Sequence, residues 1–240
     1  MSMTISVIDC GTNTFHLIVA EQQEDNFKIL FRKNIAVKLG EGGISSNKIA
    51  PAAFGRGIDA LKEFADDMKQ FIINKQLCYA TEAIRRAANG KDFVEEAKKQ
   101  SGILLEIIDG LREAELIFSG VSHAVPFGNE KVLIMDIGGG STEFVIAGNS
   151  HILWRQSFPL GAALLLDMFK PSDPINDAQE KLITEHINSV LIPLSDALTQ
   201  HGPVNTLVGS AGSFDTFLDF CHQRFSRTKT NTPWWLLELE

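Results

Sequence analysis

Residues 132–147, VLIMDIGGGSTEFVIA, combine small, hydroxyl and acidic side chains between two apolar runs. Apolar runs of this length joined by glycines predict a β-hairpin with a tight loop. The loop residues are Gly138, Gly139, Gly140, Ser141 and Thr142. Glycines let the backbone approach a ligand closely, and successive N–H groups helped by hydroxyls form a concave donor array. Such an array is suited to phosphate.

Two acids, Asp136 and Glu143, bracket this loop on the two arms of the hairpin. Carboxylates beside a phosphate would repel it unless a cation lies between them. Mg²⁺ is usually held by one or two carboxylates together with water and substrate oxygens. We therefore expect both acids to bind Mg²⁺ or Mn²⁺, although an acid at a strand end can also hydrogen-bond to its own loop.

A second copy of the pattern lies at the N-terminus, where VIDCGTNTFHLIVA aligns with IMDIGGGSTEFVIA without a gap. Asp9 stands at the place of Asp136, and His16 stands at the place of Glu143. The loop residues of this copy are Gly11, Thr12, Asn13 and Thr14. The repeat predicts two similar domains whose loops face each other across a phosphate-binding cleft. Asp9 would then hold metal or its own loop, whereas a lone histidine in an apolar strand is more typical of the core.

The remaining patterns predict the order β-β-β-α-β-α-β-α for the first domain, residues 1–125. Apolar residues at spacings of three and four predict a helix over residues 51–73, and a helix over 111–121 closes the domain. The second domain, residues 126–240, continues from its hairpin through a helix reaching about residue 200. It has fewer elements than a closed domain of this kind requires. Either the second domain is incomplete, or its C-terminal tail packs onto a partner.

Composition limits the classes of function. The chain has 240 residues, 44% of them hydrophobic, and a formal net charge of −8. That length permits one large domain or two modest ones. An acidic balance argues against nucleic-acid binding, and no apolar run reaches the roughly 18 residues of a membrane span. Cys10, Cys78 and Cys221 are far apart and form no CxxC pair, which fits a reducing compartment. We expect a soluble, cytoplasmic protein.

Five stretches resemble the exopolyphosphatase and guanosine pentaphosphate phosphohydrolase family. They are DCGTNTFHLIV, ATEAIRRAANG, EIIDGLREAELIFSGV, DIGGGSTEFVI and GSAGS, in register over residues 5–212. The resemblance implies an α/β fold with two ribonuclease-H-like (actin-like ATPase) domains flanking a cleft. It also implies metal-dependent removal of the terminal phosphate from polyphosphate or guanosine pentaphosphate.

The resemblance assigns roles that spacing alone does not. Glu113 stands at the catalytic base of the family motif I-S-G-x-E-E-A, although Arg112 replaces the preceding glutamate. Without the resemblance, Glu113 would be an ordinary solvated helix residue. Arg85 matches an arginine that holds a phosphate, and Glu82 stands where the family commonly has serine. A further loop, which meets a nucleotide in the superfold or simply opens a helix, contains Gly209, Ser210, Gly212 and Ser213.

Other functions of the same fold are weighed against hydrolysis. A sensor that binds guanosine tetraphosphate or pentaphosphate with little turnover stays open because Arg112 replaces an acid beside the base. A kinase would need an adenosine site and a sugar pocket, for which the sequence offers no pattern. A homodimer is common in the family, and Trp234 and Trp235 are a local hint of an interface.

Overall fold

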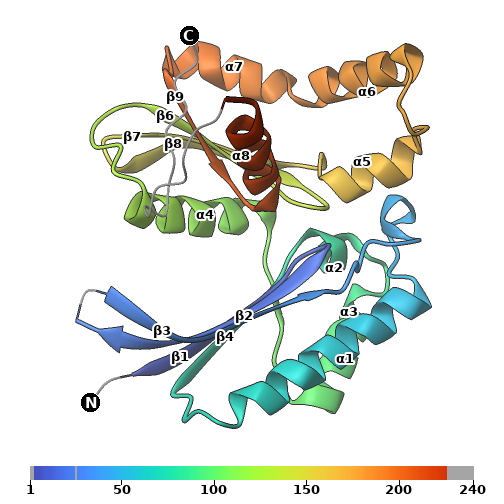
Figure 1. Cartoon of the computed structure of the whole chain (residues 1–240), viewed down its shortest axis with the longest axis vertical. Helices are drawn as coiled ribbons and strands as arrows, with labels where there is room; N and C mark the ends of the chain where they lie inside the picture. Colours follow the sequence, from blue (N-terminus) through green and yellow to red (C-terminus); the bar gives the residue numbers. More distant parts are fainter. Residues whose placement is uncertain (1–2, 25, 226–240) are drawn as a thin grey trace.

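The computed structural model describes residues 3–24 and 26–225, which form two β-sheets with helices packed around them (Figure 1). The N-terminal half contains β1 (Thr4–Cys10), β2 (Thr14–Gln23), β3 (Asn26–Ala36), the 3-10 turn η1 (Ile44–Ser46), α1 (Pro51–Met68), β4 (Lys75–Ala80), α2 (Glu82–Arg86), α3 (Gly90–Ser101), β5 (Glu106–Ile107) and α4 (Gly110–Ala124). The C-terminal half contains β6 (Val132–Ile137), β7 (Thr142–Gly148), β8 (His151–Phe158), α5 (Ala162–Phe169), α6 (Asp177–Val190), α7 (Ile192–His201), β9 (Thr206–Ser210) and α8 (Gly212–Phe225).

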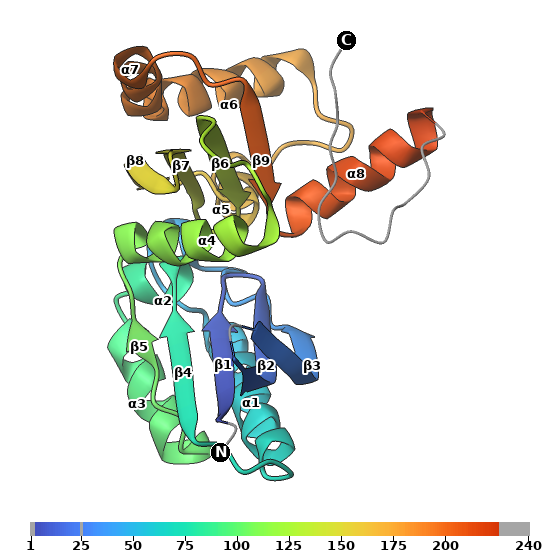
Figure 2. The ribbon, with the colours of Figure 1, turned by 90° about the vertical axis from the view of Figure 1, so that its left-hand side faces the viewer.

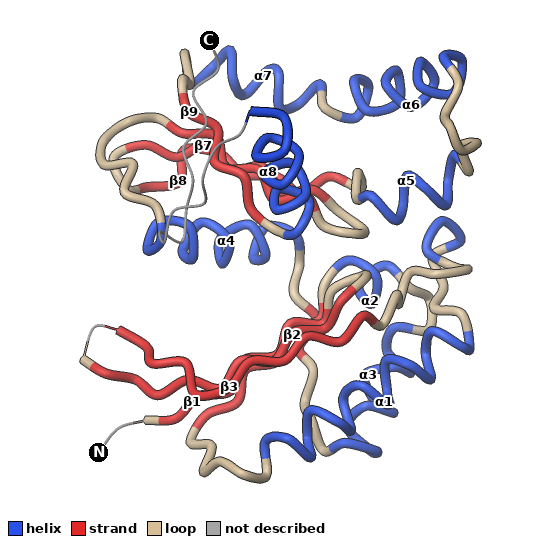
Figure 3. Tube along the Cα trace, viewed as in Figure 1, coloured by secondary structure: helices blue, strands red, loops and turns tan. Residues whose placement is uncertain are grey.

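The two sheets repeat one topology, with strand orders β3-β2-β1-β4-β5 and β8-β7-β6-β9 (Figure 3). In the first hairpin Asp9 pairs with His16, and in the second Asp136 pairs with Glu143. An antiparallel strand extends each hairpin on one side, and a parallel strand extends it on the other. The predicted repetition of the hairpin is confirmed. Within the described residues the second sheet has no counterpart of β5.

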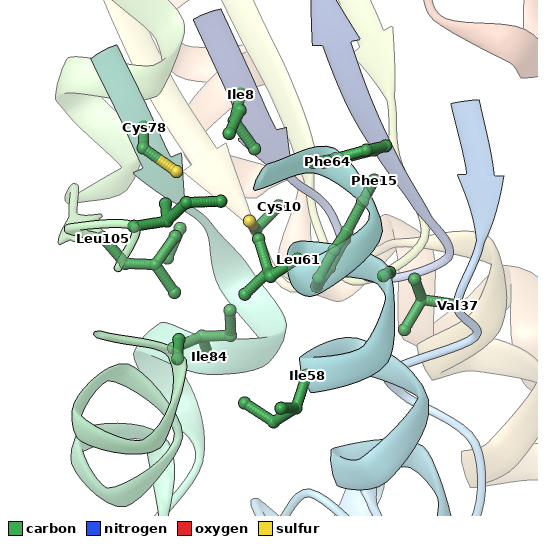
Figure 4. Packing of buried hydrophobic residues seen from close by; sticks show 14 of the residues in the cluster. Ile8, Cys10, Phe15, Val37, Ile58, Leu61, Phe64, Cys78, Ile84 and Leu105 are labelled. Carbon is green, nitrogen blue, oxygen red and sulfur yellow. The ribbon is translucent and has the colours of Figure 1, made fainter. Parts of the chain in front are cut away.

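The core of the N-terminal half lies between the first sheet and helices α1 and α3 (Figure 4). Ile8, Cys10 and Phe15 point into it from the hairpin. The helix predicted over residues 51–73 ends earlier, at Met68. The reason is that the chain must turn back into β4, and Asn74 fixes this turn because its side chain accepts a 2.8 Å hydrogen bond from the Thr4 amide.

The second sheet is covered on both faces. Helix α4 packs over one face, and residues of α6 and α7 contribute to the apolar cluster on the other. Every residue of β7 is buried as a result, including Thr142 and Glu143, and residues 144–147 are apolar without alternation. The single helix predicted to reach about residue 200 is two helices, because Pro193 in the first turn of α7 lacks the N–H that a continuous helix needs.

Helix α4 joins the two halves, and Figure 2 shows it lying between the two sheets. Asp109 caps it by accepting a 2.7 Å hydrogen bond from the Arg112 amide. Predicted to close the N-terminal domain, α4 instead packs against the second sheet, where Ala114 is fully buried against Ile134 and Val145. The division of the chain at residue 125 stays a prediction. No helix formed by the described residues is long and apolar enough to cross a bilayer.

The face under α4 has an apolar counterpart in the first sheet. The residues under α4 include Val132, Ile134, Val145 and Val208. When the two hairpins and the parallel strand beside each are aligned, the equivalent residues of the first sheet are Ile5, Val7, Ile18 and Leu77. Val7 is 36% exposed, whereas Ile134 is fully buried. The two halves therefore share a topology and differ in how this face is covered.

Phe93 of α3 is expected to be a main support of the N-terminal core. Its ring is fully buried and lies edge-on to Phe15 and Phe54, with centroids 6.5 and 5.0 Å away. We expect Phe93→Ala to lower the free energy of unfolding by about 3–5 kcal/mol in urea denaturation, because it leaves a cavity. Phe27→Ala is the matched control, since Phe27 is 60% exposed, and should cost less than about 1 kcal/mol. Equal losses would contradict this account.

Candidate active site

The glycine loop of the second hairpin is held from behind by the start of α5. The carbonyl oxygens of Gly138, Gly139 and Gly140 accept hydrogen bonds of 2.9 to 3.2 Å from the amides of residues 161–164. In a trans peptide the N–H points opposite to the preceding C=O, and these peptides are trans. The amides of residues 139–141 therefore point away from α5, and the predicted donor array exists in the backbone.

The first hairpin loop is held in the same way. The carbonyl of Thr12 accepts from the Gly40 amide at 3.2 Å, and that of Asn13 accepts from the Lys38 amide at 2.8 Å. By the same geometry, the amides of Asn13 and Thr14 point to the opposite side. Both predicted phosphate loops thus turn their carbonyls inward to the protein and their N–H groups outward.

The two loops meet each other. A Cβ atom placed on Gly139 would lie 2.8 Å from the side-chain nitrogen of Asn13, and one on Gly140 would lie 2.6 Å from Thr12 Oγ1. Glycine is required here because any side chain would force the loops apart. Thr12 is only 3% exposed, and its hydroxyl has no hydrogen-bond partner among the described residues. A buried hydroxyl without a partner is costly, so this position suits a ligand oxygen or an ordered water.

Arg85 lies on α2 beside these loops, and its guanidinium is surrounded by acceptors. Nη1 donates to the Ile108 carbonyl at 2.8 Å and to Glu113 Oε2 at 3.0 Å, while Nη2 contacts the Glu82 carboxylate. Burial opposes the charge on Arg85, but Glu113 and Glu82 raise its pKa above the ordinary value. Glu113 and Arg85, predicted as base and phosphate ligand, are thus direct neighbours.

Glu113 and Glu143 are buried acids whose charges repel each other. Burial and repulsion from Glu143 raise the pKa of Glu113 to about 8, against the opposing effect of Arg85. Burial raises the pKa of Glu143 to about 7, although hydrogen bonds from Ser157 and Ser141 lower it. The Ser157 hydroxyl donates to Glu143 Oε1 at 2.6 Å.

Asp9 and Asp136 belong to the same group of charges. Asp9 keeps contact with solvent on one side, yet the protein packed around it raises its pKa to about 6, against the effect of His16. Burial also raises the pKa of Asp136, while a hydrogen bond from Ser210 lowers it. Repulsion from Asp136 contributes to the shift at Asp9. The acids predicted from the two hairpins therefore interact electrostatically with each other.

The glycine loop after β9 also reaches this region. Ser210 pairs with Asp136 across the parallel strands β9 and β6, and the Ser213 hydroxyl donates to the Ile137 carbonyl at 3.2 Å. Gly209 leaves room for the Phe214 ring, because a Cβ atom there would lie 2.0 Å from it. Gly212 begins α8. The loop supports the Asp136 strand, and its contact with a nucleotide stays a prediction.

Asp136, Glu143 and Asp9 were predicted to bind a divalent cation, and their chemistry fits one. All three offer hard oxygen ligands, and each has a raised pKa because negative charge there is poorly compensated. Within residues 3–24 and 26–225 no three potential ligands form a ready cage. Mg²⁺ commonly takes one or two carboxylates and completes its shell with water and substrate oxygens, so the absence of a cage is compatible with it.

Ser157 had no predicted role, and Glu82 was noted only because it stands where the family commonly has serine. Ser157 lies opposite Glu143 because a β-bulge between Ile146 and Ala147 shifts the register of β7 against β8. Without that extra residue, Gln156 would face Glu143. Shifts of one residue exchange the two faces of a strand, and periodicity does not locate them. The position of Ser157 opposite Glu143 could be predicted only by locating this bulge.

The duplicated, hairpin-led sheets have the architecture of the actin-like ATPase fold. The chain belongs to the Ppx/GppA phosphatase family, whose sequence model matches residues 18–227. Among solved structures, an exopolyphosphatase from Cytophaga hutchinsonii is similar, with 38% identity and a TM-score of 0.90 over 95% of this chain and 73% of that one. The PPX-GPPA enzyme of Aquifex aeolicus is 26% identical, with a TM-score of 0.74 over 95% and 74% of the two chains.

The raised pKa values predict how stability depends on pH. A carboxyl whose pKa is higher in the folded than in the unfolded state stabilises the fold while it is protonated, and this contribution is lost as the pH rises through the folded pKa. Glu113 and Glu143, at about 8 and about 7, set the window. We expect the free energy of unfolding in EDTA to fall by a few kcal/mol between about pH 5 and about pH 9.

Glu143→Gln should reduce this fall, because the amide keeps the size of the side chain and does not titrate. Glu95→Gln, on the exposed surface of α3, is the control and should follow the wild type. Urea denaturation across the pH range measures both. A wild type as stable at about pH 9 as at about pH 5 would show that these acids are not under strain.

Proposed function

We propose that this protein is a metal-dependent phosphohydrolase that removes the terminal phosphate from inorganic polyphosphate. The observation that carries the proposal is that the two hairpin loops meet at Gly139 and Gly140, next to Glu82, which contacts Arg85 and through it Glu113. Membership of the Ppx/GppA phosphatase family and the likeness to an exopolyphosphatase support it. A phosphoryl group bound there would meet donors, an arginine and a base together.

Each part of the site then has a task. The amides of residues 13–14 and 139–141 and the Thr12 hydroxyl bind phosphoryl oxygens, and Arg85 binds the terminal phosphate as a charged fork. Glu113 orients the attacking water and takes its proton onto a carboxylate oxygen. Arg85 favours the carboxylate form of Glu113, and the pKa raised to about 8 makes that form a stronger base than an ordinary glutamate. Positioning of this kind and charge stabilisation account for most catalysis of phosphoryl transfer.

Asp136, Glu143 and Asp9 would hold Mg²⁺ or Mn²⁺ in this proposal. A cation bound there supplies positive charge to the phosphoryl oxygens of the substrate. Ser157 keeps the Glu143 carboxylate oriented through its 2.6 Å hydrogen bond. The asymmetry of the hairpins fits this division of tasks, because the first copy has His16, hydrogen-bonded to Asn34 at 2.9 Å, where the second has Glu143.

Guanosine pentaphosphate is the second candidate substrate, and a guanosine tetraphosphate or pentaphosphate sensor with little turnover is the alternative function. The sensor is an alternative because Arg112 stands where the family has a glutamate beside the catalytic base. Its side chain turns to Glu115, with Nη1 3.0 Å from Oε2, and is half exposed. The exchange at residue 112 therefore leaves the Arg85–Glu113 pair intact, which favours the hydrolase.

A cytoplasmic homodimer remains our expectation. Trp234 and Trp235 lie outside the described residues.

Glu113→Gln tests the base. Purified protein with Mg²⁺ should release phosphate from long-chain polyphosphate, and the variant should release it about 10²–10⁴-fold more slowly. Phosphate binding should persist, because the glutamine oxygen can still accept from Arg85. Glu95→Gln is the control and should match the wild type. A wild type that binds polyphosphate and guanosine pentaphosphate but releases phosphate from neither would contradict the hydrolase and favour the sensor.

Chelation tests the metal. EDTA should abolish phosphate release, and Mg²⁺ or Mn²⁺ should restore it. Asp136→Asn should raise the Mg²⁺ concentration for half-maximal activity by at least about tenfold, because it removes one charged ligand. Asp66→Asn on the exposed surface of α1 is the control. Full activity of the wild type in EDTA would exclude a role for the cation.

A further inference from the structure

Glu82 is an acid at the centre of a site that we expect to bind anions. It is the first residue of α2 and is only 7% exposed. Its two carboxylate oxygens serve two arginines: Oε2 contacts Arg85 Nη2, and Oε1 lies 3.3 Å from Arg86 Nη1. A buried carboxylate clamped in this way is an organised feature of the site.

Glu82 also touches the second phosphate loop. A Cβ atom placed on Gly140 would lie 2.9 Å from Glu82 Cγ and 2.6 Å from Thr12 Oγ1. The side chain of Glu82 thus runs along the junction where the two loops meet. Its negative charge lies next to the backbone amides that point into the same region.

Both terminal nitrogens of the Arg85 guanidinium are engaged in the absence of substrate. One nitrogen serves the Ile108 carbonyl and Glu113, and another serves Glu82. Arginine binds a carboxylate and a phosphate with the same fork of N–H groups. A phosphate that binds these terminal nitrogens of Arg85 therefore competes with a carboxylate that already holds them. Glu82 is the carboxylate with a second arginine, Arg86, to which it can remain bound.

We propose that Glu82 is a built-in competitor of the phosphoryl group: it occupies Arg85 when the site is empty and yields it, while remaining on Arg86, when phosphate binds. Glu82 thereby weakens the binding of phosphate and sets the affinity of the site. The nature of the anion rests on the proposed function. The competition itself concerns phosphate binding and requires no turnover.

Calorimetric titration with inorganic phosphate tests the competition directly. Glu82→Gln removes the charge and keeps the shape, and Glu82→Ser removes the side chain as well. Both should bind phosphate at least about tenfold more tightly than the wild type, which corresponds to about 1.4 kcal/mol. Glu63→Gln is the matched control, because Glu63 pairs with a cation, Lys33, on the outer side of α1. It should bind like the wild type.

A double-mutant cycle separates competition from a structural role. In an Arg85→Ala background the gain from Glu82→Gln should largely disappear, because no fork remains to compete for. In turnover assays Glu82→Gln should lower KM for polyphosphate by a larger factor than it changes kcat. A merely structural residue would instead lower kcat and melting temperature together.

Unchanged or weaker phosphate binding by the folded Glu82 variants would overturn the proposal and show that Glu82 only positions Arg85. Thermal melting identifies which variants are folded, and either one suffices for the decision. If the wild type hydrolyses polyphosphate and Glu82→Gln gains no affinity for phosphate, the competition alone is refuted. Tighter phosphate binding by the variant, with no hydrolysis by the wild type, refutes the hydrolase alone.

Discussion

Negative charge buried in a small volume is the constraint on which the site depends. Glu113, Glu143 and Asp9 all have raised pKa values because burial and mutual repulsion disfavour their charged forms. Arg85 compensates part of this charge by direct contact. The outward-facing amides of the two loops add positive potential without adding a side chain. Acids, arginine and glycine loops therefore form one electrostatic unit.

Repetition of the hairpin brings this unit together, and small differences between the copies assign its tasks. In both copies the residue opposite the first acid is anchored by the third strand: His16 by Asn34 and Glu143 by Ser157. Both copies carry a bulge between the second and third strands, at equivalent positions. The backbone is thus nearly the same in the two hairpins, while one offers an imidazole and the other a carboxylate at the same place.

The sequence predicted the parts of the site that depend on local pattern. The two hairpins, their glycine loops and the order of strands follow from short-range periodicity and turn residues, which act within a few residues. The expected role of Glu113 followed from the family motif. The partners of these residues did not follow, because Ser157 depends on a bulge, and Glu82 depends on how α2 packs against Gly140. Long-range packing also decided the partner of α4, which an amphipathic pattern does not specify.

Helix α4 follows the first sheet in the chain and packs against the second, and this has a consequence for substrate exchange. Gly110 at its start lies against Ser157, where a Cβ atom would come within 2.4 Å of the serine Cβ. Glu113 therefore lies on a helix that packs against the sheet of Glu143 and Asp136, while Arg85 and Asp9 belong to the N-terminal half. In the proposed hydrolase, a movement of the first sheet away from α4 would withdraw Arg85 from the product and leave Glu113 beside the second-hairpin acids for the next substrate.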